Sequence, residues 1–172
     1  MPISAAFAKG TYLTGPEFLA EAFGGEQAAP QFLLLTPELK EQASQILDRR
    51  VRGLRVRYWQ SGDATAWIME EIGKELPITI GVVIRADSIA QVKILAFRES
   101  RGWEVRYPAF TDQYRDVKIT PELKLDKHID GITGATLSVR AVNKIAALAL
   151  FYHQQAVRKT VEENGTLVPQ TP

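Results

Sequence analysis

The chain has 172 residues, of which 45% are hydrophobic and 24% charged, and these values fit one globular domain rather than a disordered or fibrous chain. Its 21 Lys and Arg against 20 Asp and Glu give a net charge of +1, so nucleic-acid binding is not expected, although five arginines gather between Arg49 and Arg57. Without cysteine the chain has no disulfide, thiolate nucleophile or Cys-ligated metal centre, and its two histidines lack the spacing of a metal site.

The N-terminal residues are too short and too interrupted for the apolar core of a signal peptide. No stretch reaches the roughly 18 apolar residues of a membrane span, so no transmembrane segment is expected. Residues 6–8, Ala-Phe-Ala, resemble the small-x-small end of a cleavage site. A trimmed export signal therefore stays open as an alternative, although no complete one is evident.

Two helices are predicted in the first fifty residues. Thr14 places a capping hydroxyl before a proline and an acid, and apolar residues then recur at helical spacing until Gly24. Thr36 repeats this start signal and predicts a second helix from about 37 to 51, with Gly53 as its terminator. We expect residues 1–53 to form a helical segment that packs on the rest of the chain.

The pattern then changes to period two with β-branched and aromatic residues. Residues 54–60 and 65–72 flank a Ser-Gly-Asp turn, and residues 77–84 and 89–97 flank a second turn. These two hairpins predict an antiparallel sheet of about four strands. With the flanking helices, the predicted fold class is α+β.

Periodicity fades between Arg98 and Asp130, apart from one short helix expected near residues 110–114. A run of this length without regular structure inside a compact domain is usually functional.

A long C-terminal helix is predicted from Leu137, because apolar residues recur there at helical spacing, and Arg158 and Lys159 are expected at its C-terminal end. We expect the main domain to span residues 54–160 and a flexible tail to follow over 161–172.

The start of this helix carries the segment best suited to chemistry, Asp-Gly-Ile-Thr-Gly-Ala-Thr-Leu-Ser at 130–138. Small residues let the backbone approach a ligand, and Gly134 permits a tight turn. The unpaired N–H groups of the first helical turn favour a phosphate. The alternative is that Thr133 or Thr136 only caps the helix.

Residues 130–138 resemble the Asp-x-x-Ser/Thr-Gly-Ala-Thr-x-Ser/Thr signature of the FMN-binding domain family, which includes flavin-carrying subunits of the Rnf and sodium-pumping NADH:quinone oxidoreductase complexes. In that family the last Thr accepts FMN through a phosphoester bond. The bond is installed by a separate flavin transferase that requires FAD and Mg²⁺. The resemblance covers residues 54–155 and implies covalent FMN on Thr136.

A second segment, Arg-Glu-Ser-Arg-Gly-Trp at 98–103, follows the last predicted strand, where the family has a Glu-Thr-Pro-Gly-like loop beside the isoalloxazine ring. Glu99 and Gly102 match this loop, whereas Ser100 and Arg101 replace its Thr and Pro.

Several of these side chains have ordinary alternatives. Trp103 is a candidate either to stack on the flavin or to cover the core. Glu99 and Arg101 either adjust the redox potential of the flavin ring by their charge or are solvated loop charges. Asp130 either holds a metal or the Thr proton during transfer, or closes a turn. No catalytic residue or resident metal ligand is predicted. The candidate cofactor-binding residues are Glu99, Arg101, Gly102, Trp103, Asp130, Thr133, Gly134, Ala135, Thr136, Leu137 and Ser138.

The resemblance implies an extracytoplasmic electron-transfer flavoprotein, since the transferase acts outside the cytoplasm. Its partners would be the flavin transferase and membrane-associated or periplasmic redox proteins, with no nucleic acid. One alternative is a flavin-dependent reductase module that acts with a separate catalytic or membrane partner. Another is a non-redox binding domain in which Thr136 is only a helix cap.

Overall fold

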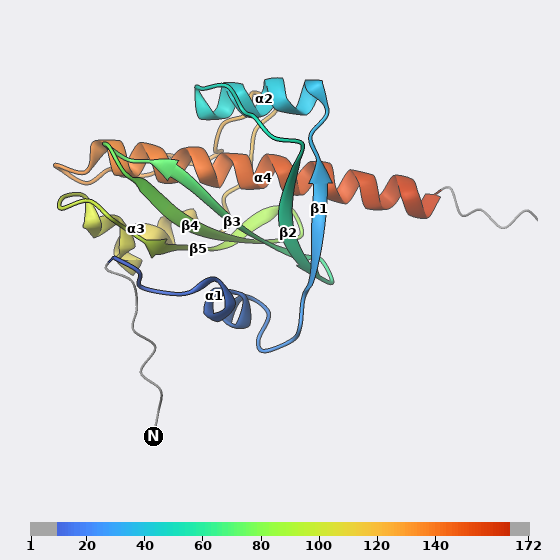
Figure 1. Ribbon diagram of the computed structural model, residues 1–172, viewed down its shortest axis with the longest axis horizontal. Helices are drawn as coiled ribbons and strands as arrows, with labels where there is room; N and C mark the ends of the chain where they lie inside the picture. The colour runs from blue at the N-terminus through green and yellow to red at the C-terminus, as the bar shows by residue number, and fades with distance from the viewer. Residues whose placement is uncertain (1–9, 166–172) are drawn as a thin grey trace, which may run out of the picture.

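Five antiparallel strands form one sheet in the computed structural model, which describes residues 10–165 (Figure 1). The strands lie side by side in chain order, so each pairs with the next. This arrangement confirms the α+β class with an antiparallel sheet. The strands are β1 (Ala29–Leu34), β2 (Arg55–Ser61), β3 (Ala64–Ile72), β4 (Pro77–Arg85) and β5 (Ser88–Ala96).

The sheet has one strand more than the four expected, and the additional strand is β1. It pairs with β2 from Ala29 opposite Gln60 to Leu34 opposite Arg55. Its sequence carries Pro30 and two consecutive leucines rather than a period-two pattern, and only Leu33 is buried. A proline is tolerated there because β1 lies at the edge of the sheet.

Strands β2 and β3 separate soon after their turn. Their pairing runs only from Ser61 opposite Ala64 to Trp59 opposite Ala66. Strand β3, in contrast, pairs with β4 along its whole length. The β1–β2 pair therefore leaves the main sheet as a ribbon and rises toward helix α2 (Figure 1).

Helices cover both faces of the sheet. Helix α4 (Thr136–Gly165) packs on one face together with α2 (Pro37–Leu47), and this larger core contains Trp67 and Tyr152. Helix α1 (Gly15–Ala22) packs on the other face, where the Phe18 side chain is fully buried.

The first helix begins as expected, with a reciprocal capping box between Thr14 and Glu17. The predicted end of the second helix was wrong, because α2 stops at Leu47 and not near residue 51. Asp48 is left-handed at φ 51°, and the Ser44 hydroxyl accepts a hydrogen bond from the Val51 N–H at 2.9 Å. The chain thus turns before it reaches Gly53.

The long helix starts at Thr136 as expected and continues to Gly165, into the segment expected as a tail. The prediction that basic residues occupy its last turn was wrong, since that turn carries none. Lys159 instead lies 3.8 Å from Glu163, a pair that supports the continued helix. Residues 6–8, with the possible cleavage site, and residues 166–172 lie outside the described part of the chain.

The segment between β5 and α4 is mostly irregular, as expected. It contains three short helices, namely η1 (Trp103–Arg106), α3 (Pro108–Thr111) and η2 (Asp112–Tyr114). Within residues 10–165, no helix has both the length and the apolarity needed to cross a bilayer.

Candidate functional site

Three segments that are distant in sequence meet around one cavity of about 460 Å³. They are the turn at 73–76, the loop at 98–102 and the start of α4. The turn follows β3 and the loop follows β5, and alternate strands of an antiparallel sheet end on the same side. The lining residues are Lys74, Glu75, Glu99, Ser100, Arg101, Gly134, Ala135, Thr136, Leu137 and Ser138.

Glu99 fixes the turn at 73–76. Its Oε1 accepts hydrogen bonds from the backbone N–H groups of Lys74 at 2.7 Å, Glu75 at 3.2 Å and Leu76 at 3.4 Å. A Cβ on Gly73 would lie 2.8 Å from the same oxygen, so a larger residue there would push the carboxylate out of its present position. The carboxylate therefore positions Lys74 at the cavity wall.

Gly102 holds the loop against the first turn of α4. Its φ of +89° favours glycine, and a Cβ added there would lie 2.4 Å from the Ser138 Oγ. The match of Gly102 to a family glycine thus has a structural reason, since the loop and the helix touch at this point.

The backbone at the start of α4 leaves hydrogen-bond donors free at the cavity. Gly134 turns the chain at φ +82°, and the Ala135 carbonyl accepts the Val139 N–H at 2.9 Å, so Ala135 stands at the cap position. The N–H groups of Thr136, Leu137 and Ser138 have no acceptor among residues 10–165. They are available to a ligand.

Thr136 itself is exposed and is the first residue of the helix. Its hydroxyl makes no hydrogen bond with the described residues, and neither does that of Thr133. Neither side chain therefore acts as the helix cap in this structure. The observation weakens the alternative in which Thr136 has a capping role alone.

The cavity wall carries two exposed cations, Lys74 and Arg101, and neither has a carboxylate partner within residues 10–165. Together with the free N–H groups they form a site suited to a phosphate. Glu75 and Glu99 also line the cavity, so the site is polar rather than uniformly positive.

Asp130 does not line this cavity. Its carboxylate is 86% exposed and lies 3.5 Å from the His128 Nε2, while its backbone N–H donates to the Gln113 Oε1 at 2.8 Å. It borders a second depression of about 430 Å³ with Tyr107 and Phe110. Among residues 10–165, no group of three or more His, Asp or Glu side chains is arranged to hold a metal ion.

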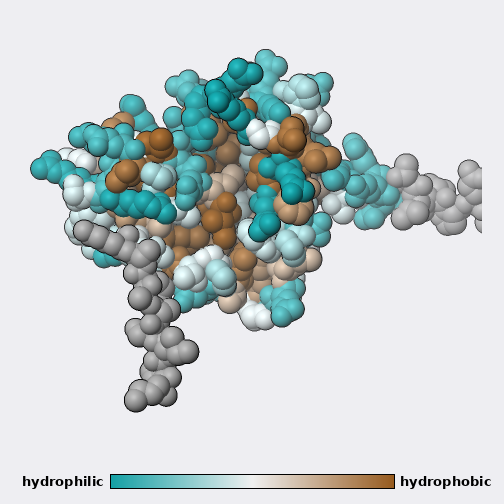
Figure 2. Space-filling view, viewed as in Figure 1, coloured by the Kyte–Doolittle hydropathy of each residue, from teal (hydrophilic) through white to brown (hydrophobic). Residues whose placement is uncertain are grey.

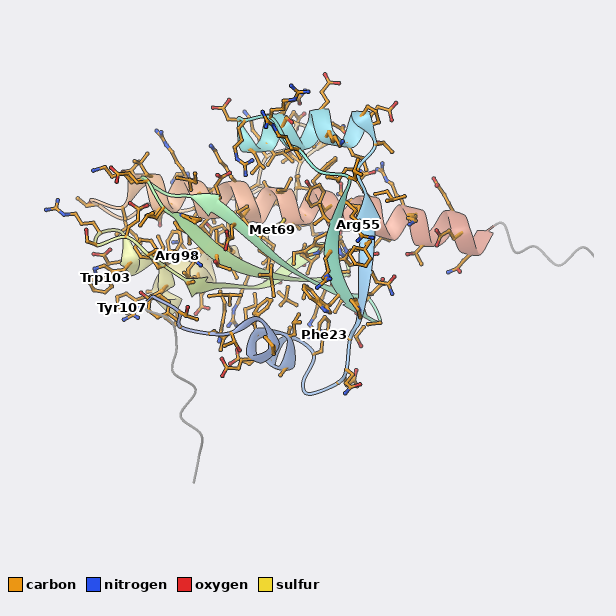
Figure 3. The ribbon with its side chains drawn as sticks, viewed as in Figure 1. Phe23, Arg55, Met69, Arg98, Trp103 and Tyr107 are labelled. Carbon is orange, nitrogen blue, oxygen red and sulfur yellow. The ribbon has the colours of Figure 1, made fainter. Side chains whose placement is uncertain are left out.

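Trp103 also lies outside the cavity lining. It is half-exposed on η1, where its ring meets the Tyr107 ring edge-on at 5.5 Å and lies 5.7 Å from the Arg106 guanidinium. Figure 3 shows Trp103 and Tyr107 together at this end of the molecule. The stacking of Trp103 on a flavin stays a prediction.

The sequence reasoning missed Lys74 and Glu75. Neither belongs to a recognisable motif, because they occupy a turn between two strands. The signal that would have found them is topological, since the ends of β3 and β5 must share one side of an antiparallel meander.

A family model, the FMN-binding domain, matches residues 73–150. A comparison with curated proteins gives no match. The matched region begins at the turn that Glu99 holds and includes the loop at 98–102, the segment at 130–138 and the first half of α4. It therefore contains every segment that lines the cavity. Residues 73–150 therefore resemble the FMN-binding domain family, in agreement with the resemblance of the 130–138 segment.

Proposed function

We propose that this chain is an electron-transfer flavoprotein whose FMN is held by a phosphoester bond to the Thr136 Oγ. The observation that carries the proposal is the free Thr136 hydroxyl at the cavity. It stands beside three unpaired N–H groups and faces the same cavity as Lys74 and Arg101. These groups suit the phosphate, and bound FMN supplies one- and two-electron chemistry that the side chains of this chain lack.

Attachment exchanges the phosphoanhydride bond of FAD for a phosphoester bond and oxidises or reduces no group. The Thr136 oxygen attacks the phosphorus of the FMN half of FAD, so a new P–O bond forms while the pyrophosphate bond to AMP breaks. AMP leaves with the bridging oxygen, and the hydroxyl proton passes to a base of the flavin transferase. The Mg²⁺ of the transferase neutralises the pyrophosphate during this exchange.

The exposed position of this segment supports modification by a separate enzyme. Thr133 and Thr136 are exposed, and Asp130 extends its carboxylate into solvent. A transferase can therefore reach the segment without unfolding α4. Asp130 is assigned to contact with the transferase or its metal, rather than to the finished flavin site.

The extracytoplasmic setting and the redox partners rest on the family resemblance. We assign the flavin transferase as the modifying partner and membrane-associated or periplasmic redox proteins as electron donor and acceptor. Lys74, Arg101 and the start of α4 hold and orient the cofactor in this scheme, while the partners supply and remove the electrons.

Intact-mass measurement after co-expression with a flavin transferase tests the attachment. The expected mass gain is that of FMN less one water. Thr136→Ala should gain nothing, whereas Thr160→Ala is the matched control and should gain the full adduct, because Thr160 lies on the same helix but outside the cavity. An unmodified wild type, or an equal adduct on Thr136→Ala, overturns the proposal.

A second measurement separates a carrier from an enzyme. The loaded protein should be reduced by dithionite and reoxidised by a larger redox protein, without sustained turnover of small acceptors. Rapid steady-state turnover of a small acceptor by the chain alone would favour the reductase alternative.

A further inference from the structure

The β1–β2 ribbon presents one face that the helices do not bury. Paired residues of neighbouring strands share a face, and Phe32 pairs with Arg57 while Leu34 pairs with Arg55. These four side chains therefore lie on the side opposite the core residue Leu33. The solvent-facing side of the ribbon therefore carries both apolar and cationic side chains.

Two leucines of this region are unusually exposed. Leu54 is 76% exposed, the highest fraction for a large hydrophobic side chain within residues 10–165, and Leu34 is 60% exposed. The Leu35 N–H donates to the Leu54 carbonyl at 2.9 Å, which places Leu54 beside the end of β1. Leu54 therefore stands opposite the buried Leu35, one position along from Leu34, and the two exposed leucines lie at the same end of the ribbon.

Cations surround these leucines. Arg55 and Arg57 lie over the Phe32 ring, at 4.2 and 5.4 Å from its centroid. Within residues 10–165 neither they nor Arg50 and Arg52 have a carboxylate partner, whereas Arg49 is paired with Glu71.

A groove of about 640 Å³ lies next to Leu54 and is bordered by Lys40, Arg50 and Arg52, together with Glu41. Figure 2 shows hydrophobic and hydrophilic residues side by side over the upper part of β1 and β2. The region combines a cationic groove with protruding aliphatic side chains.

We propose that this basic–apolar surface, defined by Phe32, Leu34, Lys40, Arg50, Arg52, Leu54, Arg55 and Arg57, docks on an anionic phospholipid bilayer. The groove cations match headgroup phosphates, and Leu54 and Leu34 enter the region between headgroups and acyl chains. The attraction comes from the local cluster, since the whole chain carries a net charge of only +1. An acidic protein would match the arginines but would leave the exposed leucines without a role.

This inference depends on charge and exposure at the ribbon and not on the flavin. The surface lies where β2 leaves the sheet toward α2, whereas the cavity lies where β3 and β5 end (Figure 1). Variants of the surface should therefore keep the FMN adduct. Loss of vesicle binding and loss of flavin attachment can thus be distinguished.

Vesicle flotation of the full chain tests the proposal. Wild type should float with vesicles of phosphatidylcholine and phosphatidylglycerol in equal parts at low salt, and should not float with phosphatidylcholine alone. High salt should release it, because exposed charges are screened. The double change Arg52→Gln and Arg55→Gln should weaken binding by roughly five-fold per charge. Leu54→Ser should weaken it by roughly ten-fold.

Matched controls use Arg140→Gln and Val161→Ser, which alter an exposed arginine and an exposed aliphatic residue of α4. Both should bind as wild type does, and circular dichroism should show every variant folded. Absence of wild-type binding to the anionic vesicles overturns the proposal, as does an equal loss in the controls. Capture by polyglutamate without vesicle binding would identify an acidic protein as the partner instead.

Discussion

Gly102 and Ser138 form the contact that joins the loop after β5 to the first turn of α4. A Cβ on Gly102 would stand 2.4 Å from the Ser138 Oγ, and the φ of +89° is one that residues with side chains rarely adopt. A side chain at Gly102 would therefore have a strained backbone and would displace the Ser138 hydroxyl. Arg101 adjoins Gly102 in the loop, Thr136 and Ser138 lie in the first turn of α4, and all three of these side chains line the cavity.

Gly102→Ala should lower the free energy of unfolding by about 3 kcal/mol, the sum of left-handed strain and overpacking. Gly62→Ala is the matched control, because Gly62 has a φ of +59° but no atom within 4 Å of its added Cβ. Gly62→Ala should lower the free energy of unfolding by only about 1 kcal/mol. Urea unfolding measures both, and FMN loading should fall for Gly102→Ala alone. Equal losses in the two variants would show that the contact with Ser138 is unimportant.

Glu99→Ala should loosen the turn at 73–76, because three backbone N–H groups lose their acceptor. The bonds are exposed, so the expected loss of stability is small, about 1 kcal/mol. The sharper readout is hydrogen exchange, which should speed up at the Lys74 amide. Glu99→Gln retains a carbonyl oxygen and should protect that amide. If Glu99→Gln exchanges as fast as Glu99→Ala, the negative charge rather than the hydrogen-bond geometry holds the turn.

The parts of the fold that were predictable from sequence are those with local causes. Thr14 and Thr36 each begin a helix because their hydroxyls accept an N–H of the first turn. The two predicted hairpins correspond to β2–β3 and β4–β5, since their period-two pattern reflects burial on alternate faces. The start of α4 at the 130–138 segment was also predictable.

The remainder depends on contacts between distant residues. Strand β1 forms because its backbone pairs with β2, and its sequence, which contains Pro30, has no pattern that would predict a strand. Helix α2 ends early because Ser44 bonds to Val51. Lys74 reaches the cavity through the Glu99 carboxylate, 25 residues away along the chain. A single sequence shows none of these pairings.

Helix α1 should be coupled to the sheet through one close contact. A Cβ on Gly81 would lie 2.6 to 2.9 Å from ring atoms of Phe18, which is fully buried. Gly81→Ala should therefore lower the free energy of unfolding by about 1–3 kcal/mol through overpacking. Phe18→Ala should lower it by about 3–5 kcal/mol, because a buried ring is lost. In the Phe18→Ala background, Gly81→Ala should cost almost nothing, since the ring is gone. A double-mutant cycle measured by urea unfolding gives the coupling, and additive losses would contradict the contact.

His153 links α4 to the sheet through a buried chain of hydrogen bonds. The Trp67 indole N–H donates to the Thr65 Oγ1 at 2.8 Å, and the Thr65 hydroxyl lies 2.6 Å from the His153 Nδ1. The other ring nitrogen, Nε2, meets the Ala86 carbonyl, which can only accept. Nε2 therefore carries the proton and Nδ1 accepts from Thr65. A second proton on the ring, at Nδ1, would make the Thr65 hydroxyl turn its own proton away and lose its acceptor.

Stability should consequently fall in mild acid. Burial lowers the pKa of His153 below its ordinary 6.5, although the Ala86 carbonyl and the Asp87 and Asp63 carboxylates oppose the shift. Below pH 6.5 the unfolded chain binds the proton first, so the free energy of unfolding decreases as pH falls toward the lowered pKa and then levels off. Each unit of separation between the folded and unfolded pKa is worth about 1.4 kcal/mol.

Urea unfolding from about pH 8 to about pH 5 measures this effect. His153→Gln should cost about 1–3 kcal/mol at the upper end, because the buried network is disturbed, and should flatten the profile toward the lower end. His128→Gln is the matched control, since His128 is 86% exposed, and its profile should follow that of wild type. A wild-type profile that stays parallel to that of His153→Gln would show that His153 is not the group that titrates. The difference between the two profiles removes the contribution of the carboxylates, so the pH below which this difference becomes constant reports the folded pKa of His153.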